Sequence, residues 1–184
     1  MISCFNGKIK VTSIQGYRDL FGKKEYHDGI DIVGITDKTV YAINDGIVTV
    51  LNEPNGFGNY CRIKTADNQY NFYYAHMSEI VVKTGQKIKK GDVLGVMGST
   101  GKSTGEHTHI CIRNVRTGKD IDIHRYTQIP KKCCVYNSTP VYTPYEAACI
   151  VERLCEFDKK LIKWLWTYPD ANNMFVKMCY QMLY

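Results

Sequence analysis

The stretch Thr39-Val-Tyr-Ala-Ile-Asn-Asp-Gly-Ile-Val-Thr-Val-Leu51 decides the fold class. Two short runs of β-branched and aromatic residues flank the turn signal Asn44-Asp-Gly46, a pattern that predicts strand, tight turn and strand. Another such run, Tyr60-Cys-Arg-Ile-Lys64, follows the turn signal Asn52-Glu-Pro-Asn-Gly56. From residue 7 to about residue 128 the sequence therefore predicts a system of antiparallel strands and not alternating βαβ units.

The composition changes after Ile129. A stretch rich in proline and lysine, residues 130–142, reads as a linker, and Thr143-Pro-Tyr-Glu146 then matches a helical capping box with proline at the first helical position. Apolar residues recur behind it at three- and four-residue steps, and a second helix is expected from about Asp170. We therefore expect a mainly β domain over residues 1–129, a linker, and a helical hairpin of unknown role over residues 143–184, α+β overall.

Length and charge restrict the class of protein. The 184 residues are 23% charged and 44% hydrophobic, which is ordinary for a soluble domain with a small appendage. No apolar run approaches the roughly 20 residues that span a bilayer. The first residues lack the apolar core of a secretory signal, so we expect synthesis in the cytoplasm with release by another route, or a piece of a longer exported chain.

The net charge of +6 favours anionic partners such as anionic wall polymers. The basic residues are scattered and form no nucleic-acid motif, so no nucleic-acid partner is expected. The eight cysteines include no Cys-x-x-Cys pair, which argues against a cysteine zinc site and favours reduced, buried thiols. The oligomeric state leaves no trace in the sequence.

Four of the five histidines lie in informative places. His27-Asp-Gly-Ile-Asp31 sets a histidine four residues before a carboxylate, and His107-Thr-His109 sets two histidines two residues apart. On a strand over residues 107–112, alternate side chains point the same way, so His107 and His109 would face one site. Two imidazoles and one carboxylate are a usual protein contribution to catalytic zinc.

These motifs sit in a longer pattern. In order, it comprises His27-x-Gly29-Ile-Asp31, Val40-Tyr-Ala42 with Asp45-Gly-Ile-Val48, Gly58-Asn-Tyr60, Tyr74-x-His76-Met-Ser78, Val82-x-x-Gly85-Gln-x-Ile-x-x-Gly91-Asp-x-Leu-Gly95, and Gly98-Ser-Thr-Gly101-x-Ser-Thr-Gly105-x-His107-x-His109. Order, spacing and glycine placement resemble those of the lysostaphin-type (LytM-like) zinc peptidases, over roughly residues 26–126. The resemblance implies an antiparallel metallopeptidase core and a zinc-dependent endopeptidase that cuts the peptides of bacterial peptidoglycan, in the stem or the cross-bridge.

The resemblance also implies residue roles. His27, Asp31 and His109 would bind one Zn²⁺ ion, while His76 and His107 would be the catalytic pair, with the general base left open between them. Tyr26, Phe57 and Tyr74 are candidates for the walls of a substrate groove, whose loops would be residues 14–26, 52–59 and 113–120. The bond cut stays open.

Several features depart from this pattern or compete with it. Cys111 stands where the family often has an acidic or amide residue, and we expect a packed thiol there. Gly98-Ser-Thr-Gly-Lys-Ser-Thr104 looks like a phosphate loop, but the first required glycine would fall on Val96. The alternative function is a catalytically silent scaffold or regulator that binds cell wall. In cellular context, a phage lysis enzyme or a wall hydrolase of the virion fits a chain without an export signal.

Overall fold

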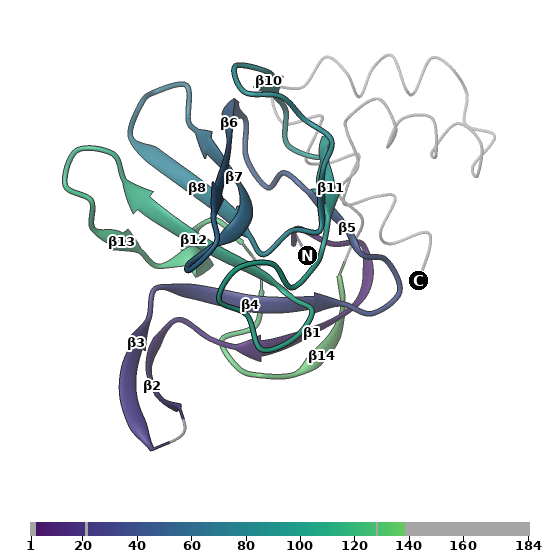
Figure 1. Cartoon of the computed structure of the whole chain (residues 1–184), viewed down its shortest axis with the longest axis vertical. Helices are drawn as coiled ribbons and strands as arrows, with labels where there is room; N and C mark the ends of the chain where they lie inside the picture. Colours follow the sequence, from purple (N-terminus) through teal and green to yellow (C-terminus); the bar gives the residue numbers. More distant parts are fainter. Residues whose placement is uncertain (1–2, 21, 128, 139–184) are drawn as a thin grey trace, which may run out of the picture. The chain divides into compact units, whose positions relative to one another are not determined.

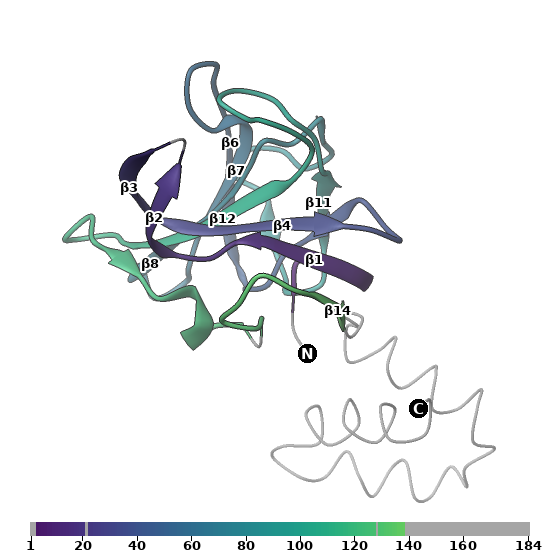
Figure 2. The same ribbon diagram turned by 90° about the horizontal axis from the view of Figure 1, so that it is seen from below.

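A computed structural model describes residues 3–20, 22–127 and 129–138 of the chain (Figures 1 and 2). These residues form β1 (Gly7–Ser13), β2 (Gly16–Leu20), β3 (Lys23–His27), β4 (Gly29–Gly34), β5 (Thr39–Tyr41), β6 (Gly46–Glu53), β7 (Gly58–Lys64), β8 (Tyr70–Ala75), β9 (Glu79–Ile80), β10 (Lys87–Ile88), β11 (Val93–Val96), β12 (Thr108–Asn114), β13 (Asp120–Ile121), the 3-10 turn η1 (Ile123–Arg125) and β14 (Val135–Ser138). No α-helix occurs in these ranges. The expectation of a mainly β, antiparallel domain is confirmed.

The main sheet is antiparallel throughout and contains nine strands. Its order is β10-β6-β7-β8-β12-β4-β1-β14, with β13 paired to β12 as well. Figure 1 shows β12 inside the sheet, with β8 on one side and β4 on the other. Its segment Thr108-His-Ile-Cys-Ile112 is buried, as a strand with neighbours on both edges requires.

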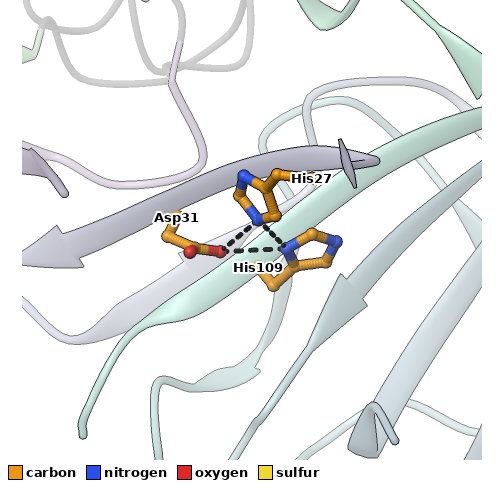
Figure 3. Close-up of side chains that lie close together, drawn as sticks. All are labelled: His27, Asp31 and His109. Atoms are coloured by element: carbon orange, nitrogen blue, oxygen red, sulfur yellow. Dashed lines mark hydrogen bonds and ion pairs between the residues drawn. The ribbon is translucent and has the colours of Figure 1, made fainter. Parts of the chain in front are cut away.

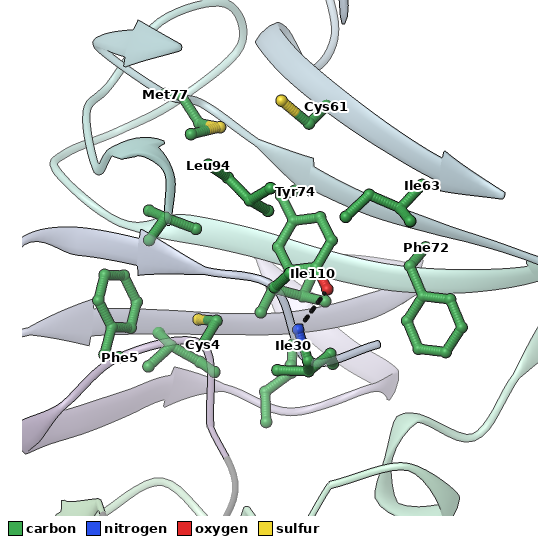
Figure 4. Close-up of a cluster of buried hydrophobic side chains, with 14 of the residues drawn as sticks. Cys4, Phe5, Ile30, Cys61, Ile63, Phe72, Tyr74, Met77, Leu94 and Ile110 are labelled. Atoms are coloured by element: carbon green, nitrogen blue, oxygen red, sulfur yellow. Dashed lines mark hydrogen bonds between the residues drawn. The ribbon is translucent and has the colours of Figure 1, made fainter. Parts of the chain in front are cut away.

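One face of this sheet carries the hydrophobic core. Alternate residues of β12 and β4, such as Ile110 and Ile32, point into it together with Phe72 and Tyr74 of β8 (Figure 4). Burying one such aliphatic or phenylalanine side chain contributes roughly 1.5–3 kcal/mol. Because side chains alternate along a strand, His109 and Asp31 lie on the opposite face, directly across from each other in the β4–β12 register.

Two smaller sheets complete the domain. One has the order β5-β11-β9. The other is the β2–β3 hairpin, which covers most of the expected groove loop at residues 14–26 and leads into β4 (Figure 2). Tyr17 and Tyr26 face each other across this hairpin, with ring centroids 5.3 Å apart.

The segment that the sequence predicted to be a linker contains a strand. Residues 135–138 form β14, which pairs with β1 at the edge of the main sheet. By its internal contacts the chain divides into the units Met1–Val141 and Tyr142–Tyr184. The helical hairpin expected at residues 143–184 lies outside the described residues and stays a prediction. Across the described ranges, no helix has the length and apolarity that crossing a lipid bilayer requires.

Candidate active site

Three side chains from three strands converge on one point (Figure 3). His27 lies at the end of β3, Asp31 in β4 and His109 in β12. His27 Nε2 lies 3.0 Å from His109 Nδ1, and Asp31 Oδ1 lies 3.1 Å from the first and 2.9 Å from the second. The two histidines are almost fully buried. This cluster unites residues that are 82 positions apart in the sequence.

Gly29 explains why the first motif needs a glycine. It pairs with Cys111 where β4 and β12 run side by side. A Cβ atom at Gly29 would collide with the Ile110 carbonyl oxygen and would lie 2.8 Å from Cε1 of His109. The missing side chain therefore lets the strand that carries Asp31 approach the strand that carries His109.

Backbone carbonyl groups orient three of the histidine rings. Nδ1 lies 2.9 Å from Ile14 O in His27, 2.8 Å from Thr100 O in His76 and 2.8 Å from Gly105 O in His107. Because a carbonyl oxygen can only accept a hydrogen bond, we assign the ring proton to Nδ1 in each case. Nε2 of each neutral ring then carries a free lone pair.

His76 and His107 lie next to this cluster. Their ring centroids are 4.7 Å apart, and His107 Nε2 is 3.6 Å from Asp31 Oδ1. His76 has a φ of 62°, an uncommon backbone conformation for a residue with a side chain. Burial lowers the pKa of His76 below its ordinary value, although the hydrogen bond to Thr100 acts in the opposite direction. A neutral imidazole is therefore favoured there.

Arg18 of the β2–β3 hairpin reaches the same cluster. Its guanidinium contacts Glu25 Oε1 at 2.6 Å and Ser13 Oγ at 2.7 Å, and it lies 3.3 Å from Asp31 Oδ2. Burial acts to raise the pKa of Asp31, but its close contacts with His109 and His27 outweigh it and hold that pKa well below its usual range. Sequence analysis missed Arg18, because no local pattern ties it to a carboxylate 13 residues later.

A second ionic group lies behind His109. Asp28 Oδ1 is 3.1 Å from His109 Nε2, and Asp28 Oδ2 is 2.5 Å from Arg113 Nη2. Burial acts to raise the pKa of Asp28, yet His109 and Arg113 together lower it strongly. Cys111 contributes to the same neighbourhood, since one donor atom each from Asp28, His109 and Cys111 lie within 4.8 Å of one another. Burial raises the pKa of the Cys111 thiol.

A cavity of about 450 Å³ borders the cluster of His27, Asp31 and His109. Its lining includes Tyr26 and Phe57 together with His27, Asp31, His76, His107 and His109. Phe57 also stacks on His109, with ring centroids 5.5 Å apart and planes inclined by 28°.

Tyr74 faces the other way. It is fully buried in the core (Figure 4), where its hydroxyl accepts a hydrogen bond from Ile43 N at 2.9 Å and donates one to Asn44 Oδ1 at 3.0 Å. The structure thus brings Tyr26 and Phe57 to the cavity, whereas Tyr74 lies on the face of β8 that packs into the hydrophobic core. His124, for which the sequence offered no role, bonds to Ile129 O through Nδ1.

Comparison with known proteins agrees with this arrangement. The model of peptidase family M23 matches residues 25–123, which is more than half of the chain and includes all five residues of the cluster and its neighbouring pair. The chain belongs to peptidase family M23.

Three curated relatives of this M23 chain are named peptidoglycan DD-endopeptidases. Peptidoglycan DD-endopeptidase ShyA of Vibrio cholerae is 39% identical over 83 residues, which are 45% of this chain and 19% of that protein. The chain spans about a fifth of the length of the curated relatives it matches.

Two solved M23 structures share its fold. The catalytic domain of the prophage-encoded M23 protein EnpA from Enterococcus faecalis is 34% identical, with 62% of this chain and 88% of that chain covered and a TM-score of 0.55. The catalytic domain of the antimicrobial peptidase lysostaphin from Staphylococcus simulans is 26% identical, with 65% and 92% covered and a TM-score of 0.56.

Proposed function

We propose that this chain is a zinc-dependent endopeptidase that hydrolyses peptide bonds of bacterial peptidoglycan. The observation that carries the proposal is the convergence of His27 Nε2, Asp31 Oδ1 and His109 Nδ1 to within 3.1 Å of one another. Membership of the M23 family and the names of its relatives support the reaction class and the substrate.

The donor set suits zinc. Two neutral imidazoles and one carboxylate leave one position of a tetrahedral zinc ion open. Ligand atoms about 2.0–2.1 Å from such an ion lie roughly 3.3 Å apart. The three atoms here are 2.9–3.1 Å apart, so a slight opening of the cluster accommodates the ion. Three electron-rich atoms at this spacing also require a cation or protons between them to offset their repulsion.

His27, Asp31 and His109 would hold the ion, which supplies Lewis acidity to the scissile carbonyl and lowers the pKa of water. The chain itself supplies the proton transfer. His76 and His107 each point an unprotonated Nε2 away from an anchored Nδ1, and both line the cavity. One of them would take a proton from the attacking water and return it to the leaving amine, while the other would accept a hydrogen bond from the water and orient it or, in its protonated form, donate one to the developing oxyanion.

The substrate would occupy the cavity between the β2–β3 hairpin and the loop before β7. Tyr26, half exposed, and Phe57 border it on these two sides. Aromatic walls suit a peptide backbone and its short apolar side chains, because they bury area with little loss of rotamer freedom. The net charge of +6 supports additional attraction to anionic wall polymers, which added salt would weaken.

The test is release of free amines from purified sacculi of several wall types, with and without a zinc chelator. Release that the chelator abolishes supports the endopeptidase, and the new N-terminal residue identifies the bond. Full retention of zinc with no release from any wall would replace the enzyme by the alternative, a silent wall-binding scaffold.

Two variants separate binding from turnover. His109→Ala should lose zinc and activity together, because a metal ligand is removed. His107→Ala should keep zinc and lose about 10²–10⁴-fold in turnover, the usual contribution of a positioned acid–base group. Turnover of His107→Ala near the wild-type rate would remove His107 from the catalytic pair.

A role in phage lysis or in the virion is part of the proposal. The similarity to a prophage-encoded M23 protein supports it. Recovery of the chain from purified phage particles, or from lysates only at the time of host lysis, would separate the two contexts.

A further inference from the structure

His109 Nε2, the ring nitrogen that faces away from His27 and Asp31, is buried and needs a hydrogen-bond partner. With Nδ1 directed to His27 and Asp31, the ring points Nε2 away from the cluster, into a buried region. An imidazole that binds a metal through Nδ1 keeps its proton on Nε2. A buried N–H group that lacks an acceptor destabilises the folded protein. Some group in this region must therefore accept that proton.

Two groups of the described structure lie close enough. Asp28 Oδ1 is 3.1 Å from His109 Nε2, although the ring N–H is not aligned with it as a hydrogen bond in this structure. Cys111, two residues along the same strand and on the same face, offers a sulfur atom in the same neighbourhood. A neutral thiol sulfur is a weak acceptor, whereas a carboxylate is a strong one.

Asp28 is held in place by a cation. Arg113 binds Asp28 Oδ2 through Nη2 at 2.5 Å and Asp120 Oδ1 through Nε at 3.2 Å. The guanidinium also lies over the rings of Phe57 and Tyr73, at 5.6 and 5.2 Å from their centroids. These contacts fix one carboxylate oxygen of Asp28 and leave the other facing His109.

We propose that Asp28, held by Arg113, is a positioning residue that accepts the Nε2 proton of His109 and so fixes the tautomer and orientation in which His109 binds the metal. The inference rests on the proposed metal site. Metal-binding histidines commonly donate their second ring N–H to a carboxylate, and Asp28 takes this role for His109. On the same face of β12, the neighbouring residue Cys111 offers only a thiol.

The test compares Asp28→Asn with Asp120→Asn. Each change removes one carboxylate from Arg113, but only Asp28 faces His109. The dissociation constant for zinc, measured by competition with a chromogenic chelator, should rise about 10–100-fold in Asp28→Asn, the usual effect of losing such a partner. It should stay within about threefold of wild type in Asp120→Asn, where no partner of a ligand is lost.

The cobalt spectrum supplies a second readout. Visible absorption bands of the Co²⁺-loaded protein should shift in Asp28→Asn and not in Asp120→Asn, because they report on ligand geometry and not on folding. If Asp28→Asn fails to fold, Asp28→Glu replaces it. The longer side chain keeps the charge for Arg113 but displaces the oxygen from His109, so zinc affinity should again fall.

Cys111→Ala is the third variant and should leave zinc affinity and the 1:1 stoichiometry unchanged. Wild-type zinc affinity in Asp28→Asn would overturn the inference, as would a loss in Cys111→Ala equal to that in Asp28→Asn. A second zinc equivalent that disappears in Cys111→Ala would also overturn it, since Asp28 would then be a metal ligand. A wild-type chain that binds no zinc would instead refute the proposed function itself.

Discussion

Tyr74→Phe removes one oxygen atom from the core and tests on which side of the sheet this residue acts. Its hydroxyl accepts a hydrogen bond from Ile43 N and donates one to Asn44 Oδ1, at 2.9 and 3.0 Å. The half-buried Asn44 can turn to water, but the buried N–H of Ile43 loses its acceptor. The cost of such an orphaned group is about 1–3 kcal/mol.

The corresponding change in melting temperature follows from the size of the folded unit. Unfolding entropy near 60 °C is about 2.1 cal/mol/K per residue, so a unit that spans Met1–Val141 unfolds with roughly 0.3 kcal/mol/K. A loss of 1–3 kcal/mol therefore lowers the melting temperature by about 3–10 °C. Calorimetry and urea denaturation in the presence of a chelator measure this without a contribution from bound metal.

Tyr73→Phe is the matched control. Tyr73 is the preceding residue of β8, and its ring faces the opposite side, beside Phe57 and Arg113. Its substitution should change the free energy of unfolding by less than about 0.5 kcal/mol. The reasoning is refuted if Tyr74→Phe unfolds like wild type, or if it lowers kcat/KM on a soluble peptide at unchanged stability. The second result would place Tyr74 in the groove, as the sequence suggested.

Two further predictions concern the site directly. Gly29→Ala should weaken zinc binding at least about 10-fold and lower stability, because the added Cβ displaces the Ile110 carbonyl and the His109 ring. In the control Gly118→Ala the added Cβ meets no atom within 4 Å, so this change should lower stability modestly and leave zinc affinity unchanged. Equal zinc affinities in the two variants would contradict this explanation. The lowered pKa of His76 means that its imidazole stays neutral to a pH below the ordinary value near 6.5. If His76 is the general base, the acidic limb of kcat/KM at saturating zinc should therefore lie below about pH 6.5. A limb above that value would assign the essential base to another group.

The sequence by itself determined the local chemistry of the site. Runs of β-branched residues and turn signals predicted the antiparallel strands, and β5, β6, β7 and β12 lie where those runs were recognised. The spacing of His107 and His109 placed both on one face of a strand, because side chains alternate with a period of two residues. The structure brings both to the same cavity. These features depend on neighbours in the chain, which the sequence contains directly.

Tertiary structure decided what depends on strand register. Tyr73 and Tyr74 look alike in sequence, and only the pairing of β8 with β12 sets which of them faces the core. The link from His109 through Asp28 to Arg113 joins residues up to 85 positions apart, and the contact of Arg18 with Asp31 depends on how the β2–β3 hairpin leads into β4. Residues 135–138, with the composition of a linker, became a strand because the edge of β1 was free to pair. Pairing between distant strands is a cooperative property of the whole sheet, so no local pattern of residue types specifies it.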